Sequence, residues 1–165
     1  MDEFNKIEKD AIGSLNRIID QLEYERDYYE CDITMEYSPF EEDVKLFCDN
    51  FISAYLANDE KKKAFDLLVR LVNVMAKNEC EMYEEDIFRP TELLTYYFAK
   101  IISLSNGSLK NRIHNWMYSF TKENEESLIA NDYFRVFLEG KLIYHADKYY
   151  TNYADYKKVL SYYKP

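Results

Sequence analysis

Histidine and cysteine, the side chains that most often bind metals or act in catalysis, are few in this sequence of 165 residues. The two histidines are His114 and His145, and neither follows a glutamate by three residues, as a di-iron carboxylate bundle requires. The three cysteines, Cys31, Cys48 and Cys80, are too far apart to form a paired zinc-binding motif. We therefore expect no metal and no cofactor.

Motifs for nucleophilic or phosphate chemistry are missing as well, since the sequence has no Gly-rich phosphate loop, no GxSxG and no HExxH. Its 31 acidic residues include many pairs that would serve as general acid and base, but no spacing singles out one pair. Because catalysis needs several residues brought together in defined roles, we predict that the chain is not an enzyme.

The acidic residues are concentrated near the N-terminus, and this asymmetry is the most informative functional feature of the sequence. Residues 1–50 contain 15 acids and five bases, whereas residues 51–165 contain 16 of each. The formal net charge of −10 therefore belongs entirely to the first 50 residues. Like charges at this density repel one another, and a basic partner would relieve the repulsion.

Tyrosines are interleaved with these acids. Between residues 20 and 43, ten acids accompany four tyrosines and a single base, Arg26. Tyrosine is enriched at the centres of protein interfaces, because it buries a large ring and keeps a polar tip. A plainer interpretation is a solvated helix end and loop that keep the protein soluble. A second acidic stretch, residues 79–86, has five acids and no base.

We predict that the main partner-binding surface lies in the acidic N-terminal third, and that the second stretch extends it if the fold brings the two together. The predicted surface consists of acids and tyrosines outside the apolar faces of the expected helices. Its members are Glu23, Tyr24, Asp27, Tyr28, Glu30, Asp32, Glu36, Tyr37, Glu84, Glu85 and Asp86.

These features favour a small acidic binding protein that neutralises or caps a basic protein. A nuclease toxin or another nucleic-acid-binding protein is a partner of this kind, because its Lys and Arg side chains would meet the acids. Direct binding of nucleic acid is not expected, since phosphates repel carboxylates. In size and charge the chain is similar to bacterial immunity proteins and DNA-mimic inhibitors, a likeness that involves no shared motif.

Two other functions are compatible with the sequence. The chief alternative is a helical adaptor or scaffold module that binds a peptide or subunit in a groove between helices. A carboxylate-based enzyme is the third. The N-terminal residues lack a signal peptide, and no stretch reaches the roughly 20 apolar residues of a membrane span. We therefore expect a cytoplasmic protein that does not contact a membrane.

Apolar residues recur at helical spacing along the chain, which contains only three glycines and three prolines. No stretch alternates as a strand would. The sequence predicts a single all-α domain over residues 1–165, with six to eight helices in antiparallel pairs that form a compact bundle or a short helical array. The clearest pair spans residues 38–76, joined by a turn at residues 57–60. We predict that its core includes Phe51, Leu68, Leu71 and Trp116.

Capping residues set the expected helix limits. The first helix runs from Asp2 or Glu3 to about Glu30, and Ser38-Pro39-Phe40-Glu41 begins the second. Asn58 or Asp59 is expected to cap the third helix. The later signals are Arg89-Pro90-Thr91 at the start of the fourth helix, Asn106-Gly107 at its end, Ser108 before the fifth, Asn124 or Ser127 before the sixth, and Gly140 after it. Residues 141–163 are expected to form one or two further helices.

Overall fold

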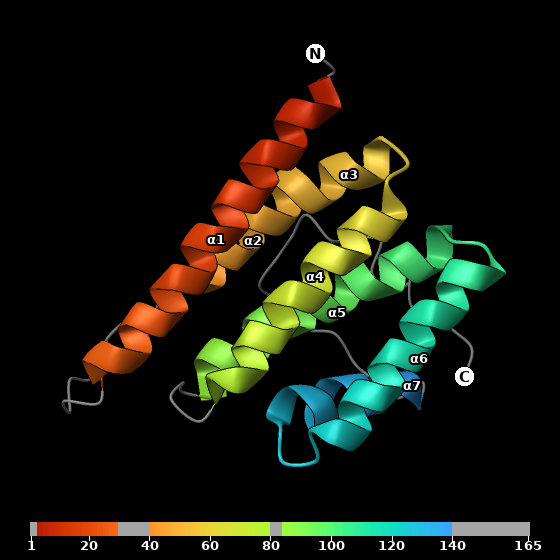
Figure 1. Cartoon of the computed structure of the whole chain (residues 1–165). Helices are drawn as coiled ribbons and strands as arrows, with labels where there is room; N and C mark the ends of the chain where they lie inside the picture. Colours follow the sequence, from red (N-terminus) through yellow and green to blue (C-terminus); the bar gives the residue numbers. More distant parts are fainter. Residues whose placement is uncertain (1–2, 30–39, 80–83, 140–165) are drawn as a thin grey trace. The chain divides into compact units, whose positions relative to one another are not determined.

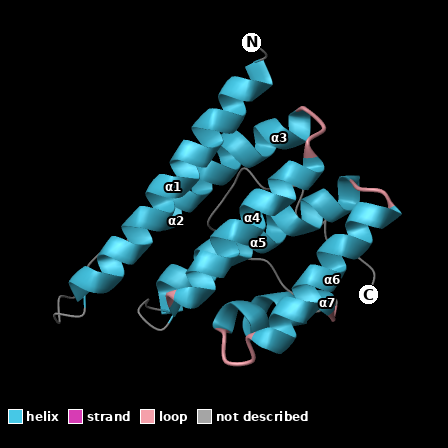
Figure 2. Cartoon of the chain, in the orientation of Figure 1, coloured by secondary structure: helices cyan, strands magenta, loops and turns pink. Residues whose placement is uncertain are grey.

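The computed structural model describes residues 3–29, 40–79 and 84–139, with side chains described except at 23–29, 40–41 and 84–89. In this part of the chain the regular structure is helical and contains no strand (Figure 2), which confirms the all-α prediction. The tail helices expected over residues 141–163 lie outside the described residues. No helix in the described part is long and apolar enough to cross a membrane.

Backbone contacts divide the chain into two units, Met1–Pro90 and Thr91–Pro165. Figure 1 labels the helices along the chain. The prediction of one domain remains a prediction. The first unit contains α1 (Glu3–Tyr29), α2 (Phe40–Phe47), η1 (Cys48–Ile52), α3 (Ser53–Ala57) and α4 (Lys61–Lys77). Helix α5 (Glu84–Leu104) runs through the boundary, and the second unit continues with α6 (Gly107–Glu123), η3 (Ile129–Phe134) and α7 (Arg135–Leu138). The two η segments are short π-helical turns.

In the first unit, α1 packs against both members of the predicted helix pair, one of which is α2–η1–α3 and the other α4. Apolar residues at three- and four-residue spacing supply the core, among them Leu15 on α1, Val44 on α2 and Leu68 on α4, all fully buried. The salt bridge from Lys63 Nζ to Glu8 Oε2, 2.8 Å long, links α4 to α1 at the surface.

The turn between α3 and α4 falls at the expected residues, but its polar side chains act differently from the prediction. Asn58 donates through Nδ2 to the carbonyl of Ala54 at 2.8 Å, so it caps the end of α3. Asp59 has a positive φ of 58° and accepts from Lys61 Nζ at 2.8 Å. Glu60 is the residue before α4, and its side chain makes no capping hydrogen bond. The prediction that Asn58 or Asp59 caps this helix is therefore wrong, because Asn58 bonds backward and Asp59 bonds to a side chain.

The π turn η1 changes which side chains the second helix buries. The N–H of Ser53 donates to the carbonyl of Cys48, five residues earlier, instead of four. A π turn holds an extra residue, so positions around it depart from the 3.6-residue spacing. Ile52 is fully buried whereas Phe51 is only half-buried. The prediction of a buried Phe51 is therefore wrong.

Tyr55 on α3 joins the core of the first unit and makes it sensitive to alkali. Its ring centroid lies 5.1 Å from that of Phe4, and burial, together with the charges of Glu8 and Glu60, raises its pKa to about 12. In the unfolded chain the phenol ionises near its ordinary pKa of 10.0. The unfolded state therefore loses its proton first, and this contribution to stability is complete below pH 10 and is lost as pH rises to 12.

We accordingly expect the free energy of unfolding to fall between pH 10 and pH 12, and to fall less steeply in Tyr55→Phe. Urea denaturation of both proteins across this range is the measurement. Tyr133 also has a raised pKa, caused first by burial and then by Glu92 and Asp132, so some alkaline loss should persist in the variant. Parallel pH profiles for parent and Tyr55→Phe would show that Tyr55 ionises normally in the folded protein.

Gly13 lies in the interior of α1, where glycine is a poor helix former. A methyl group at this position would lie 3.8 Å from Nη1 of Arg17, an ordinary van der Waals distance. Gly13→Ala should therefore raise the free energy of unfolding by about 0.5–1 kcal/mol, because alanine loses less conformational entropy in a helix. The change is measured by the urea midpoint.

Gly107 provides the matched control for this prediction. It is the first residue of α6, and a methyl group there would meet nothing within 4 Å. Because the first turn has little intrahelical hydrogen bonding, Gly107→Ala should gain less than Gly13→Ala. A lower midpoint for Gly13→Ala than for the parent would contradict the described packing of Arg17 over α1.

The start of α5 corrects the prediction for Pro90. The helix begins at Glu84, so Pro90 lies inside it and not at its first position. Acids in a first turn are favourable beside the positive end of the helix dipole, and Glu84, Glu85 and Asp86 occupy that turn. The preference for acids in the first turn outweighs the preference for proline at the first helical position. Pro90 lies inside the helix and leaves it without one backbone N–H donor.

In the second unit, aromatic rings fill the space between α5, α6 and η3. Phe98 stacks on Trp116 with centroids 5.4 Å apart, and Phe134 lies 5.6 Å from Phe98. Trp116 is nevertheless only half-buried, so the prediction of a buried Trp116 is wrong. Tryptophan is so large that it is seldom covered completely. Helix α6 begins at Gly107, one residue before the expected cap Ser108. The hydroxyl of Ser127 accepts from the N–H of Ala130 at 3.3 Å, which confirms Ser127 as a helix start.

Candidate functional site

The predicted partner-binding residues are only partly covered by the described structure. Glu23, Tyr24, Asp27 and Tyr28 belong to the last turns of α1, and Glu84, Glu85 and Asp86 belong to the first turn of α5. Their side chains lie outside the described part, as do the residues Glu30, Asp32, Glu36 and Tyr37 altogether. Whether these acids and tyrosines form one surface therefore stays a prediction.

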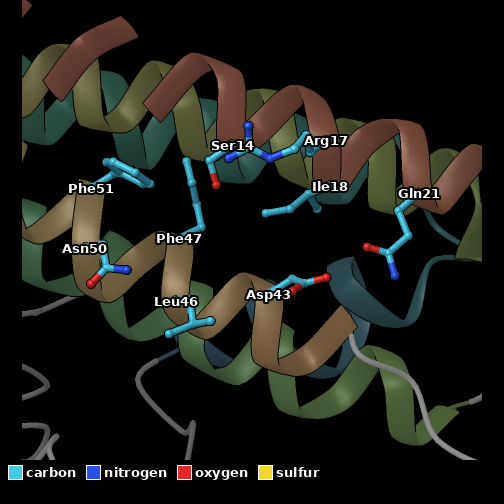
Figure 3. Close-up of a pocket in the computed structure, with 9 residues that line it drawn as sticks. All are labelled: Ser14, Arg17, Ile18, Gln21, Asp43, Leu46, Phe47, Asn50 and Phe51. Carbon is cyan, nitrogen blue, oxygen red and sulfur yellow. The ribbon is translucent and has the colours of Figure 1, made fainter. Parts of the chain in front are cut away.

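A groove in the first unit lies between α1 and the continuous helix α2–η1, and encloses a volume of about 460 Å³ (Figure 3). This volume is in the range of ordinary ligand pockets. Four lining residues come from α1 and five from α2–η1. They are Ser14, Arg17, Ile18, Gln21, Asp43, Leu46, Phe47, Asn50 and Phe51.

The helical repeat explains why these residues share one groove. On α1 the lining residues follow one another at i, i+3, i+4 and i+7, which is one face of a helix. On α2–η1 the first four follow the same spacing, starting from Asp43. Because α1 packs along α2, the two faces form opposite walls, as Figure 3 shows. Sequence reasoning missed this site because both faces mix polar and apolar residues and carry no apolar stripe.

The floor of the groove is apolar and its rim is partly so. Ile18 and Phe47 are buried, with 4% and 1% of their surfaces exposed. Phe51 is half-buried, and its ring centroid lies 6.1 Å from that of Phe47. Leu46 exposes 46% of its surface, a large fraction for a leucine. Leu46 and Phe51 therefore give the groove apolar surface that a ligand would remove from water, whereas Ile18 and Phe47 are already covered.

The two walls of the groove carry side chains of opposite charge. Arg17 projects from α1 and Asp43 from α2, and neither forms an ion pair among the described residues. Partial burial, and second the neighbouring charge of Glu42, raises the pKa of Asp43 above its ordinary value. A cation from a ligand would offset both effects on Asp43, and a ligand anion or carbonyl would suit Arg17.

Comparisons with known proteins gave no match. This holds for protein-family models, for curated proteins and for solved structures. The fold and the groove are therefore interpreted from their own geometry.

The groups that most often carry chemistry do not gather in the described structure. Among the described residues, no group of three or more His, Cys, Asp or Glu side chains is placed to hold a metal ion. Cys48 is fully buried, and burial followed by the charge of Asp49 raises the pKa of its thiol well above the ordinary value. A thiol in that state is a poor nucleophile, so Cys48 serves as a small core residue. His114 is half-buried on α6, and His145 lies outside the described residues.

Proposed function

We propose that this chain is a small, acidic, all-α binding protein that caps or neutralises a basic protein partner. One observation carries the proposal: the net negative charge is confined to the first of the two units into which the backbone divides. Met1–Pro90 contains 23 acids and 11 bases, a net charge of −12, whereas Thr91–Pro165 contains eight acids and ten bases. The acidity is thus a property of one folded unit, as expected for an interaction surface.

Electrostatic attraction explains how the acidic first unit would recognise a basic partner. A surface of one sign attracts a partner of the opposite sign over roughly a Debye length, about 8 Å at physiological ionic strength. The attraction raises the association rate and orients the encounter, and the buried contacts that form afterwards set the lifetime of the complex. A nuclease toxin or another nucleic-acid-binding protein fits as the partner, because its own binding face is rich in Lys and Arg. In this role the protein acts by occupying that face, without catalysis, in the reducing cytoplasm.

A helical adaptor is the second candidate function, and the groove between α1 and α2–η1 specifically favours it. A groove with an apolar floor and opposite charges on its walls suits a peptide segment of a partner, whatever the net charge of that partner. The two functions differ in their salt dependence. An adaptor that depends on apolar contacts should bind almost equally at low and high ionic strength, whereas capping of a basic protein should weaken as salt rises.

A salt series of association rates tests the proposed function. The full chain is used to recover its partner from the source cell, and the partner is purified and identified. We expect a protein with a basic surface whose association with the chain slows at least tenfold from low salt to well above physiological salt. A recovered partner that is acidic or neutral, or an association rate unchanged by salt, would reject the capping function and leave the adaptor as the better interpretation.

A further inference from the structure

We propose that the groove between α1 and α2–η1 binds an amphipathic segment of the partner protein. The segment places apolar side chains against Leu46 and Phe51, above the buried floor of Ile18 and Phe47, and a Lys or Arg beside Asp43. The inference rests on the proposed function in one respect, the basic character of the partner. It adds the site at which the partner binds and the pattern of residues that the bound segment of the partner must have.

The form of the groove suits a helical segment better than a compact small molecule. Its walls are two helices that lie along one another, and each contributes residues over two turns. A side-chain row at i, i+3, i+4 and i+7 on a bound helix would extend along such a groove, which is how amphipathic helices bind between helices. The volume of about 460 Å³ accommodates several apolar side chains from that row.

The exposed apolar surface at the rim supports a macromolecular ligand. Leu46 is one of four large hydrophobic side chains that are exposed in the described structure, and it borders the groove beside half-buried Phe51. Another of the four, Ile12 on α1, is 39% exposed but does not line the groove. A bound segment would cover Leu46 and leave Ile12 in water, which makes the two residues a matched pair for a test.

Charge complementarity determines the sign of the segment. Eight of the nine lining residues belong to the first 50 residues, which carry the whole excess of negative charge, and the ninth is Phe51. Asp43, on the α2 wall, is partly desolvated and has no ion-pair partner among the described residues, so a Lys or Arg of the segment would gain a charge-assisted hydrogen bond there. Arg17, the other charged residue of the lining, lies along α1 beside Ser14 in Figure 3 and does not face Asp43, so the segment that fits is basic on the flank that lies along α2.

Three synthetic peptides of equal length serve as probes. The first has leucines at i, i+3, i+4 and i+7, with lysines along one flank. The second has the same composition with the leucines distributed around the helix. The third carries glutamates in place of the lysines. We expect the first peptide to bind the full chain at least tenfold more tightly than either of the others, measured by fluorescence anisotropy.

Paired variants locate the binding to the groove. Leu46→Ser and Asp43→Asn should each weaken binding of the first peptide about three- to tenfold, by loss of apolar contact and of the ion pair respectively. Ile12→Ser and Asp20→Asn remove the same groups from exposed positions of α1 outside the groove, and should leave binding unchanged. Circular dichroism and urea midpoints of all four variants establish that each is folded.

The outcomes separate this inference from the proposed function. If the four variants bind the first peptide equally, or if the second or third peptide binds as tightly as the first, the groove assignment is wrong. The proposed function would still stand if the natural partner is basic and its association depends on salt. If the groove variants weaken the first peptide but the natural partner proves not to be basic, the groove is a peptide site and the capping function fails.

Discussion

Leu68→Ala should lower the free energy of unfolding by about 2–5 kcal/mol. Leu68 lies on α4 in the first unit, and none of its surface is exposed. Its neighbours on the same helical face, Phe65, Leu71 and Val72, are also buried, so the structure cannot refill the space that the missing methyl groups leave. The loss combines the transfer of apolar surface with the cost of the cavity.

Urea denaturation followed by circular dichroism measures this effect, and Leu46→Ala is its control. Both variants remove the same atoms from a leucine in a helix of the first unit, but Leu46 is 46% exposed. Its replacement should cost clearly less than that of Leu68. Phe51→Ala should also cost less than Leu68→Ala, because the ring is only half-buried. Equal urea midpoints for Leu68→Ala and Leu46→Ala would mean that the described α4 core is wrong.

Reversing the charge of Glu23, Asp27 and Glu30 together, each to lysine, should slow association with a basic partner by more than tenfold at low salt. The triple variant changes the charge of the acidic first unit by six, from a net −12 to −6. Long-range attraction acts on the encounter, so the association rate should fall more than the dissociation rate rises. Stopped-flow or surface-binding kinetics at several salt concentrations measures both rates.

The matched control reverses Glu123, Glu125 and Glu126, three exposed acids of the second unit. It makes the same change in total charge, so a general effect of net charge would slow both triple variants equally. We expect the control to have a much smaller effect. Tyr28→Ala should act differently from either, mainly by raising the dissociation rate, because a buried ring contributes after the encounter. If the two triple variants associated with the partner at equal rates, the acidic N-terminal third would not be the binding surface.

Local patterns in the sequence were enough to predict the all-α fold class and much of the helix order. Helical periodicity is a local property, so the apolar spacing on α1 and α4 was sufficient to identify those helices and their buried faces. The turn at residues 57–60 and the helix start at Ser127 were likewise predictable, because capping and turn preferences act within a few residues. The charge asymmetry needed only a count along the chain.

The burial of Phe51 and Trp116 and the existence of the groove depend on packing between residues far apart in the sequence, which no short stretch of sequence contains. The π turn at Cys48–Ile52 moved Phe51 out of the core and into the wall of a groove, although its spacing is that of a buried residue. Trp116 stayed half-buried because burial depends on what packs over the ring. The groove itself joins residues of α1 to residues of α2–η1 about 30 positions later, and those positions mix charged, polar and apolar side chains. Sequence periodicity does not reveal such a site, because neither helix face has an apolar stripe and the groove forms only when the two helices pack together.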